Sequence, residues 1–422
     1  MKEKVSNIPI GAKSTCGSQN KKPRLAVVSP FLDKSHGTER CVAEQIERLA
    51  QDYEIHVYST AIRDVDLSKI IWHRIPRLPG PHLTSYIWFF MANHLWRWWD
   101  RLFKKLDFDL VFSPGINCSD ANIIAVHIVF TEFYRIARPE LALRRNPPRM
   151  WPRLIHRKLS YHLFMALERW LYARDEVRLA VTSRKMEQDL KRCFNRNGRM
   201  ALVYNGVDLD QMNPGRCRSL REKARGALQL PESAFAILLI GNDWKKKGLR
   251  CLIEAVGSLC IPQLRILVVG HDKSFSYHDI LRRNGLEDRM MILPIVPNVE
   301  SYYAVADMYA GPSLEDSFAM PPLEAMACGL PVIVSRQAGV SELVTHGVDG
   351  FVLEDPTGSR RLAELIHDIY KSAELRRNLG LRAEATARQH TWQRNAEKMK
   401  AVFEEYLQDK EDRAGLAANS QT

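Results

Sequence analysis

Short apolar runs alternate with longer amphipathic stretches along this 422-residue chain, and the whole alternation occurs twice. Continuous apolar runs rich in β-branched residues are typical of strands buried on both faces. Their alternation with helices predicts a doubly wound, parallel α/β sheet. In the first series we expect strands at residues 24–29, 54–59, 109–115, 123–127, 177–183 and 201–206. In the second we expect strands at residues 234–241, 264–270, 290–296, 308–314, 331–335 and 351–355.

The two series predict two Rossmann-like domains facing each other across a cleft, residues 23–207 and residues 208–389. Residues 208–218 contain Asn213-Pro214-Gly215 and have the composition of a linker. Residues 1–22 are basic and polar, which predicts a flexible leader. In open α/β sheets a ligand binds beyond the carboxyl ends of the strands, so we expect the functional site in the cleft.

The net charge of +12 is distributed unevenly. Residues 1–200 hold 34 basic and 20 acidic side chains, a net of +14, whereas residues 201–422 hold 27 and 29, a net of −2. A basic half indicates either a polyanionic partner, nucleic acid or an anionic membrane, or a solvated surface that only aids solubility. Eight scattered cysteines without disulfide or zinc-ligand spacing favour a cytoplasmic location. The longest apolar run, residues 86–92, is too short to span a bilayer.

Segment 311–334 contains the highest concentration of candidate functional residues in the chain. An expected strand ends near Pro312, an acidic loop follows, and Pro321 and Pro322 can open a helix because a first-turn proline loses no intrahelical hydrogen bond. Glu324 then lies in the first turn of that helix. Its carboxylate can accept hydrogen bonds from the two hydroxyls of a ribose, and the helix N-terminus attracts phosphate. Taken alone, a first-turn acid would more simply favour the helix dipole.

This segment resembles the signature of the retaining glycosyltransferases of family 4, which have the GT-B fold. The family signature is PS-x-x-E-x-FG-x-x-x-x-EAMA-x-G-x-PV. The chain matches it at Pro312, Ser313, Phe318, Glu324, Ala325, Met326, Ala327, Gly329, Pro331 and Val332. The resemblance implies that Glu324 binds the ribose of a nucleotide sugar. It also implies that Asp316, eight positions earlier, holds hydroxyls of the donor sugar, with Glu315 as the alternative.

The residues around these two acids are implied to complete the donor site. They are Glu315, Ser317, Phe318, Ala319 and Met320. Ala319 stands where the family has a glycine, and Asp316 stands where the family has a glutamate. Because aspartate is shorter by one methylene, its contact with the sugar is expected to be shifted.

A lysine-rich loop at residues 241–248 follows an expected strand and can present ammonium groups to a diphosphate. The alternative is an ordinary solvated basic loop. The resemblance assigns the diphosphate contact to Lys247. Asn242 stands at the family's arginine position, so that contact is either absent or supplied by Lys245 or Lys246.

Three residues of the N-terminal half are implied as further site residues. Gly37 lies in the turn after the first strand, where the family often has two glycines, and His36 replaces the other. His127 ends an expected strand and resembles the family's histidine that reaches the donor sugar across the cleft. Arg184 follows another strand and could meet phosphate. The alternatives are an ordinary tight turn for Gly37 and a structural histidine at position 127.

Two further stretches resemble the family at places where the chain passes between the domains. Asn205-Gly206-Val207-Asp208 resembles its hinge, in which glycine permits an unusual backbone conformation. Residues 390–409 resemble the helix that crosses back onto the N-terminal domain. Residues 410–422 are then expected to form a flexible tail.

The resemblance implies transfer of a sugar from a UDP- or GDP-linked donor to an acceptor hydroxyl, with retained configuration and without a metal or other cofactor. A lipid-linked or glycan acceptor in envelope or polysaccharide biosynthesis is expected. Three alternatives stay open: a catalytically degenerate subunit of the same fold, a nucleotide-sugar epimerase, and a basic nucleic-acid-binding protein. No nucleic-acid-binding signature is present, so nucleic acid is not expected as a partner.

The aromatic segment 86–106 is expected to form a helix. Its stripe at helical spacing is Trp88, Ala92, Leu95, Trp99, Leu102 and Leu106, which we expect to pack on the sheet. The aromatic residues outside this stripe are Phe89, Phe90, Trp96 and Trp98. Together with Arg97 and Arg101 they suit a membrane interface. We therefore hypothesise reversible docking of the N-terminal domain on the inner face of an anionic membrane.

Overall fold

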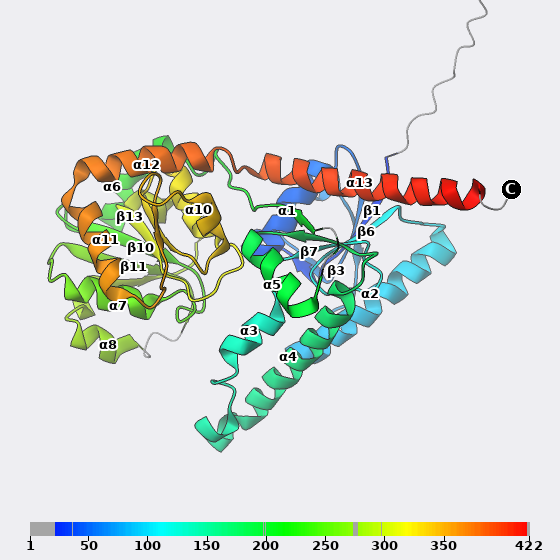
Figure 1. Cartoon of the computed structure of the whole chain (residues 1–422), viewed down its shortest axis with the longest axis horizontal. Helices are drawn as coiled ribbons and strands as arrows, with labels where there is room; N and C mark the ends of the chain where they lie inside the picture. The colour runs from blue at the N-terminus through cyan, green and yellow to red at the C-terminus, as the bar shows by residue number, and fades with distance from the viewer. Residues whose placement is uncertain are drawn as a thin grey trace, which may run out of the picture.

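The computed structural model describes residues 22–35, 37–196, 198, 200–272, 277–296 and 298–419 (Figure 1). The chain forms two α/β domains, each built on one sheet with helices on both faces. The N-terminal sheet has the strand order β5-β3-β1-β6-β7-β8-β9, and the C-terminal sheet has the order β12-β11-β10-β13-β14-β15. Neighbouring strands in both sheets pair in parallel, which confirms the doubly wound architecture.

The elements of the N-terminal domain follow the alternation seen in the sequence. Its sheet consists of β1 (Arg24–Val28), β3 (Glu54–Ser59), β5 (Ile71–Arg74), β6 (Leu110–Pro114), β7 (Ile123–Val126), β8 (Arg178–Val181) and β9 (Met200–Leu202). Its helices are α1 (Gly37–Leu49), α2 (His82–Lys104), α3 (Phe130–Ala137), α4 (Trp151–Tyr172) and α5 (Arg184–Phe194). A two-stranded sheet of β2 (Phe31–Leu32) and β4 (Ala61–Ile62) lies beside them.

The C-terminal domain repeats the pattern. Its strands are β10 (Phe235–Ile240), β11 (Leu264–Val269), β12 (Met290–Leu293), β13 (Met308–Gly311), β14 (Val332–Ser335) and β15 (Phe351–Leu353). Its helices are α6 (Pro214–Ala227), α7 (Leu249–Ser258), α8 (His278–Arg283), α9 (Glu300–Val305), α10 (Met320–Ala327), α11 (Ser359–Lys371) and α12 (Ala373–Ala387). A final helix, α13 (Trp392–Asn419), leaves this domain.

The two faces of β1 explain why its sequence is apolar throughout. Leu25 and Val27 pack in the core shared with α1 and α13, and Ala26 and Val28 pack in the core shared with α2 and α4. Successive side chains of a strand point to opposite faces, so a strand covered on both sides needs apolar residues at every position.

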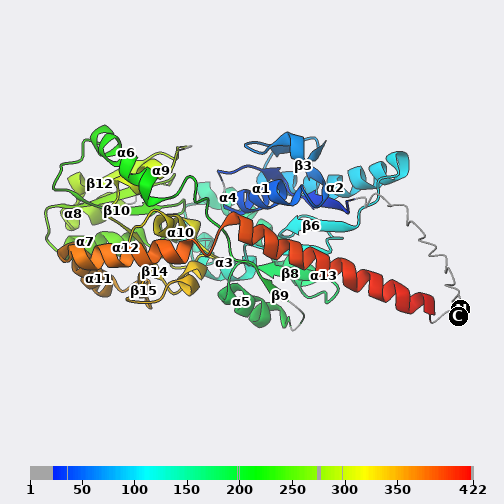
Figure 2. The same ribbon diagram turned by 90° about the horizontal axis from the view of Figure 1, so that it is seen from above.

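Helix α13 returns to the N-terminal domain and lies along it (Figure 2). The ring of Phe403 contacts Tyr53, with centroids 5.7 Å apart, and Gln45 Nε2 donates a hydrogen bond to Asn395 Oδ1 at 2.9 Å. The expected crossover helix is therefore present. It continues to Asn419, so most of the stretch expected as a tail, residues 410–422, is helical.

The two chain segments that join the domains lie side by side. Val207 N donates a hydrogen bond to the carbonyl oxygen of His390 at 3.0 Å. A Cβ at Gly206 would lie 2.3 Å from the backbone nitrogen of Trp392. The sequence suggested that this glycine serves an unusual backbone conformation, but its φ is not positive. The close approach of the two segments is what excludes a side chain there.

The expected linker, residues 208–218, is shorter in the structure. Helix α6 already begins at Pro214, and the side chain of Asn213 caps it by accepting a hydrogen bond from Arg216 N at 2.9 Å. Proline is well suited to the first helical turn, so a triplet that suggested a linker instead starts a helix. Residues 1–21 of the expected leader lie outside the described residues.

Candidate active site at the domain interface

The two loops with the expected donor residues leave neighbouring strands of the C-terminal sheet. Strands β10 and β13 pair where the strand order changes direction. Residues 241–248 follow β10, and residues 312–319 follow β13. Lys247 Nζ donates a hydrogen bond to the carboxylate of Asp316 and so joins the two loops. Such a switch point is where open α/β sheets bind their ligands.

Gly248 allows these loops to touch. Its φ is +78°, and a Cβ at this position would lie 1.9 Å from the carbonyl oxygen of Pro312. Only glycine fits both restrictions. Leu314 N also donates a hydrogen bond to the carbonyl oxygen of Lys246 at 2.7 Å, so backbone contacts hold the lysine beside the acid.

The structure separates the two neighbouring acids that could hold the donor sugar. Asp316 contacts Lys247 within the donor loops. Glu315 instead accepts a hydrogen bond at 2.6 Å from Lys185 Nζ, which belongs to α5 of the other domain. Burial raises the pKa of the Glu315 carboxyl, and the charge of Lys185 only partly offsets this rise. Asp316 therefore lies within these two loops whereas Glu315 contacts the other domain, and the assignment of Asp316 to the sugar stays a prediction.

Glu324 lies on α10 with both carboxylate oxygens occupied. Tyr303 on α9 donates its hydroxyl hydrogen to Oε2 at 2.5 Å. Arg40 on α1 donates to Oε1 at 2.6 Å across the domain interface. The carboxylate is thus fixed at the interface and faces a cation from the N-terminal domain.

The residues between Asp316 and Glu324 form a tight connection into α10. Phe318 is buried against Tyr204, and the carbonyl oxygen of Ser317 accepts a hydrogen bond at 3.0 Å from Ser183 of the N-terminal domain. Ala319 has φ +67° and directly precedes Met320, the first residue of α10. A positive φ raises the conformational energy of any residue with a Cβ. This explains why the family that the segment resembles has glycine at this position.

Replacing Ala319 with glycine is expected to stabilise the protein by about 1 kcal/mol, because the positive φ then carries no Cβ strain. The midpoint of thermal unfolding, compared with that of the wild type, measures the effect. An Ala325→Gly variant within α10 serves as the opposite control and should destabilise the protein. An unchanged or lower midpoint for Ala319→Gly would contradict the strain assigned to this position.

Lys246 and Asn242 occupy other parts of the lysine loop. Lys246 Nζ lies 4.1 Å from the ring centroid of Phe133, on α3 of the N-terminal domain. The side chain of Asn242 accepts a hydrogen bond from His271 N at 2.9 Å and so ties the loops after β10 and β11 together. At the position where the family has an arginine, this chain therefore has a side chain used for loop structure.

His127 follows β7 and lines a cavity of about 810 Å³ in the N-terminal domain. The imidazole is buried, and its Nε2 atom has no hydrogen-bond partner among the described residues. Burial lowers its pKa to about 4, so the ring is neutral at physiological pH. A buried polar atom without a partner, in a residue that lines a cavity, calls for an explanation, and a bound ligand is one.

Gly37 and Arg184 lie on different parts of the interface. A Cβ at Gly37 would lie 3.5 Å from Met320 Cε, so the start of α1 contacts the start of α10. Arg184 is exposed, and its backbone nitrogen donates a hydrogen bond to Glu342 at 2.8 Å. A protein carboxylate thus occupies this helix terminus, and the contact of the Arg184 side chain with phosphate stays a prediction.

The expected orientation of helix α2 is only partly right: Ala92 and Leu106 of the predicted stripe are buried and Trp88 packs against the core, but other residues differ. Phe89 is buried, and Arg97 is buried in an ion pair with Asp120 at 2.7 Å, so neither can contact a membrane. Leu95 and Trp99, expected inside, are about half exposed. The inward face of α2 is polar because a buried network satisfies it: Asp100 there accepts hydrogen bonds from the Tyr58 hydroxyl and His73.

The other four residues of the expected membrane interface differ from one another in exposure. Phe90 and Trp96 are partly buried. Trp98 is exposed, and Arg101 is exposed with its guanidinium paired to Asp107. Trp98 and Arg101 therefore remain available to a partner surface.

Sequence reasoning missed Arg40 and Tyr303 as neighbours of Glu324. Arg40 follows Gly37 by one helical turn, in a turn already singled out, so a basic residue at that spacing was the available signal. Tyr303 lies in an ordinary helical stretch and gave no signal.

Two facing Rossmann-like domains with a C-terminal helix that returns to the first domain define the GT-B class of fold. Residues 35–211 match the family model described as Glycosyltransferase Family 4, and residues 221–386 match the model described as Glycosyl transferases group 1. The chain belongs to glycosyltransferase family 4.

Two curated relatives show the extent of the similarity. The chain is 30% identical over 207 residues to D-inositol 3-phosphate glycosyltransferase of Paenarthrobacter aurescens, a match covering 47% of this chain and 50% of that protein. It is 29% identical over 212 residues to N-acetyl-alpha-D-glucosaminyl L-malate synthase of Bacillus anthracis, covering 49% and 54%. The chain thus spans about half the length of the curated relatives it matches.

Three solved structures share the fold. WaaG, a glycosyltransferase involved in lipopolysaccharide biosynthesis, aligns with a TM-score of 0.72 at 18% identity, over 90% of this chain and 99% of that one. Sucrose-phosphate synthase from Thermosynechococcus elongatus gives 0.72 at 18% identity, over 91% and 99%. Anabaena HepE in complex with UDP-glucose gives 0.65 at 19% identity, over 90% and 99%. These similarities establish the GT-B fold.

Proposed function

We propose that this protein transfers a sugar from a nucleotide diphosphate donor to an acceptor hydroxyl. The observation that carries the proposal is the arrangement of Lys247, Asp316 and Glu324 at the switch point of the C-terminal sheet, facing the N-terminal domain. A ribose binds Glu324, the diphosphate binds Lys247, and hydroxyls of the sugar bind Asp316. His127, on the opposite domain, offers its unpartnered Nε2 to the sugar or the acceptor.

We propose that the configuration of the sugar is retained. The acceptor hydroxyl attacks on the face from which the diphosphate departs, and the departing phosphate oxygen takes its proton. This chain then supplies orientation of the two substrates and stabilisation of the charge that develops on the diphosphate. HepE was crystallised with UDP and with UDP-glucose, which makes UDP-sugars the first donors to test, followed by GDP-sugars.

The acceptor is proposed to bind in the 810 Å³ cavity beside His127. Arg63 and Arg77 line this cavity and are exposed, and the remainder of its wall includes Tyr86 and Phe89 from α2. Arginine suits recognition of phosphate and carboxylate groups. The names of two relatives specify inositol phosphate and malate, both anionic hydroxyl compounds. We therefore propose an acceptor hydroxyl on a lipid-linked or glycan molecule that also carries an anionic group.

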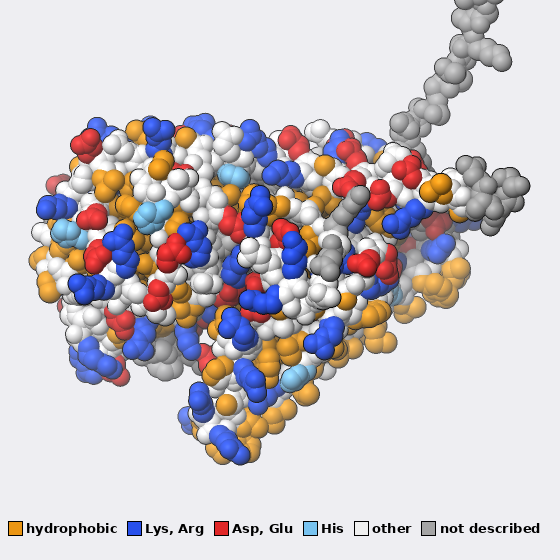
Figure 3. All heavy atoms as spheres, viewed as in Figure 1, with side chains coloured by type: hydrophobic (Ala, Val, Ile, Leu, Met, Phe, Trp, Pro, Cys, Tyr) orange, Lys and Arg blue, Asp and Glu red, His pale blue; other side chains and the backbone are white. Residues whose placement is uncertain are grey.

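Helices α2 and α4 together expose a continuous series of large apolar side chains, seen along the lower edge of the molecule in Figure 3. On α2 these are Ile87, Met91, Leu95, Trp98, Trp99, Leu102 and Phe103, and on α4 they are Trp151, Ile155, Leu159 and Trp170. Basic residues beside them include Arg101, Lys104, Arg153, Arg157 and Arg169. No described helix is long and apolar enough to cross a membrane.

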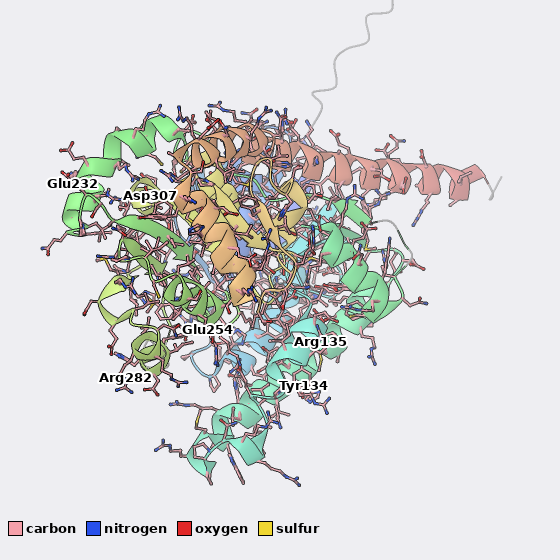
Figure 4. All side chains as sticks on the ribbon, turned by 60° about the vertical axis from the view of Figure 1, so that its left-hand side comes forward. Tyr134, Arg135, Glu232, Glu254, Arg282 and Asp307 are labelled. Atoms are coloured by element: carbon pink, nitrogen blue, oxygen red, sulfur yellow. The ribbon has the colours of Figure 1, made fainter. Side chains whose placement is uncertain are left out.

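We propose that this apolar face docks on an anionic membrane surface. Apolar and aromatic side chains edged by Lys and Arg suit the interface of an anionic bilayer. The same helix α2 also lines the acceptor cavity, so docking would bring a membrane-bound acceptor to the site. Tyr134 on α3, labelled in Figure 4, packs against the middle of α4, with its ring centroid 5.5 Å from that of Tyr161.

The double variant Trp99→Ala/Phe103→Ala is expected to lower vesicle binding about tenfold or more, because burial of each large apolar side chain contributes about 1.5–3 kcal/mol. The ring centroids of Trp99 and Phe103 lie 4.1 Å apart, and both side chains are exposed. Flotation with phosphatidylglycerol-containing vesicles measures the effect. Leu381→Ala, an exposed apolar residue on α12 of the other domain, is the control. Equal flotation of the wild type with neutral and anionic vesicles would refute docking. A protein that does not float and is a dimer in solution would also refute it, because a second copy would then cover the apolar face.

A panel of UDP-, GDP- and ADP-sugars tests the proposed function. At least one donor should raise the unfolding temperature of the wild type. The same donor should have little effect on Glu324→Ala, which lacks the proposed ribose contact. If no donor stabilises the wild type, the donor site is not functional and the fold serves another role.

A further inference from the structure

Arg40 is an N-terminal-domain residue placed inside the proposed donor site. It lies in the first turn of α1, and its guanidinium donates to Glu324 Oε1 at 2.6 Å. The Arg40 side chain is 14% exposed and that of Glu324 is 7% exposed. The contact is therefore a largely buried ion pair between the two domains.

The second oxygen of Glu324 is also engaged. Tyr303 is completely buried and donates its hydroxyl hydrogen to Oε2 at 2.5 Å. Each carboxylate oxygen can accept a second hydrogen bond, but only 7% of the Glu324 side chain is exposed, so a ribose gains access to it by displacing one of the two partners. Tyr303 is fixed in the core of the C-terminal domain, whereas Arg40 reaches in from the other domain, so Arg40 is the partner that gives way.

Arg40 cannot simply be released into the interface. A guanidinium stays protonated in proteins, and a buried charge that loses its partner is strongly destabilising. Glu44 on the same helix, whose charge also acts on Arg40, is already engaged: it accepts a hydrogen bond from Arg48 at 2.5 Å and lies 3.9 Å from Lys34. A ligand that takes Glu324 must therefore bring an anion for Arg40.

The lysines of the donor loop are already paired. Lys247 contacts Asp316, and Lys245 contacts Glu140. Lys246 lies 3.1 Å from Asp243. The loop itself contains no arginine, and residue 242 is an asparagine. A diphosphate bound there would thus benefit from a guanidinium supplied from the opposite domain.

A nucleoside diphosphate meets both requirements in one molecule. Its ribose diol can replace Arg40 at Glu324, and its phosphates, only a few bonds from that diol, can accept hydrogen bonds from the released guanidinium. A nucleoside without phosphates meets only the first requirement.

We propose that Arg40 is a donor-binding residue that exchanges partners when the donor binds: the ribose takes its place on Glu324, and Arg40 moves to the diphosphate. The exchange rests on the proposed function. It lets the N-terminal domain contact the donor through a charged group, so the interface stays closed around a bound diphosphate.

Titration calorimetry with two ligand pairs, UDP with uridine and GDP with guanosine, tests the exchange. The variants are wild type, Arg40→Gln and the control Arg48→Gln, which removes a guanidinium on the same helix that pairs with Glu44. In the wild type, one diphosphate should bind at least 100-fold more tightly than its nucleoside. In Arg40→Gln this ratio should fall at least tenfold, and the nucleoside alone should bind as well as, or better than, it binds the wild type.

The outcomes separate the exchange from the proposed function. If the ratio of diphosphate affinity to nucleoside affinity is the same in Arg40→Gln as in the wild type and in Arg48→Gln, the exchange is overturned, while the proposed donor site stands. Weaker binding of nucleoside and diphosphate by the same factor also overturns it, since Arg40 would then only hold the interface together. A wild type that binds neither diphosphate overturns the proposed function, and the exchange with it.

Discussion

Replacing Lys247 with alanine is expected to reduce the turnover of the sugar donor by about 10²–10³-fold, equivalent to about 3–4 kcal/mol of transition-state stabilisation. The bond to the sugar breaks as negative charge develops on the diphosphate, and a fixed cation stabilises that charge most. Lys247 is fixed by its contact with Asp316 and by the close approach of Gly248 to Pro312. Release of the nucleoside diphosphate, measured in a coupled assay, gives the rate.

Arg250→Ala is the matched control for Lys247→Ala. Arg250 lies on α7 three residues later, is exposed, and pairs with Glu254, which Figure 4 labels. Its loss removes the same charge from nearly the same place, but an exposed pair of this kind contributes little. Equal losses in the two variants would show that only the overall charge of the loop matters. Unchanged turnover in Lys247→Ala would place the diphosphate elsewhere.

Acidification is expected to destabilise the folded protein through His127, by about 3 kcal/mol between pH 6.5 and pH 4. Burial lowers the pKa of this imidazole to about 4, whereas the unfolded chain titrates near the ordinary value of 6.5. Between these values the unfolded state binds a proton that the folded state does not. The contribution to stability is therefore complete above pH 6.5 and is lost as the pH falls to 4.

The free energy of unfolding, measured in urea at several pH values, tests this prediction. His127→Asn should show a smaller loss of stability on acidification than the wild type. His367→Asn, which replaces a half-exposed histidine on α11, should follow the wild type. Because burial also lowers the pKa values of His73 and His94, the difference between His127→Asn and wild type carries the result. Parallel pH profiles for these two proteins would contradict the burial of a neutral imidazole at this position.

The strands of both sheets could be predicted because each is buried on two faces and therefore apolar along its length. The positions of the proposed donor residues Asp316, Glu324 and Lys247 at the domain interface could be predicted because they lie in short segments, whose residue spacing is visible in the sequence. The replacement of the family's glycine by Ala319 was also visible in the sequence, but the positive φ of this residue was known only from the structure.

Contacts between residues that are far apart in the chain could not be predicted from the sequence. Arg40 and Glu324 are separated by 284 residues, and neither neighbourhood indicates the other. The choice between Glu315 and Asp316 likewise depended on Lys185, which lies in the other domain.

Helix α2 shows a second reason for failure. Helical periodicity identifies an apolar face and assumes that it is buried. Here the buried face carries Arg97 and Asp100, whose partners come from distant parts of the chain. Leu95, Trp99 and Leu102 of the predicted stripe are therefore exposed while Ala92 and Leu106 are buried, and only the structure could reveal this division.

The central question is whether this protein turns over a nucleotide sugar at the domain interface. Nucleoside diphosphate release should be measured with UDP-, GDP- and ADP-sugars for the wild type, Lys247→Ala and Glu324→Gln, after circular dichroism has shown that all three are folded. We expect release from at least one donor by the wild type, and at least 100-fold slower release by both variants. Equal release by all three proteins, or none from any donor by the wild type, would contradict this expectation.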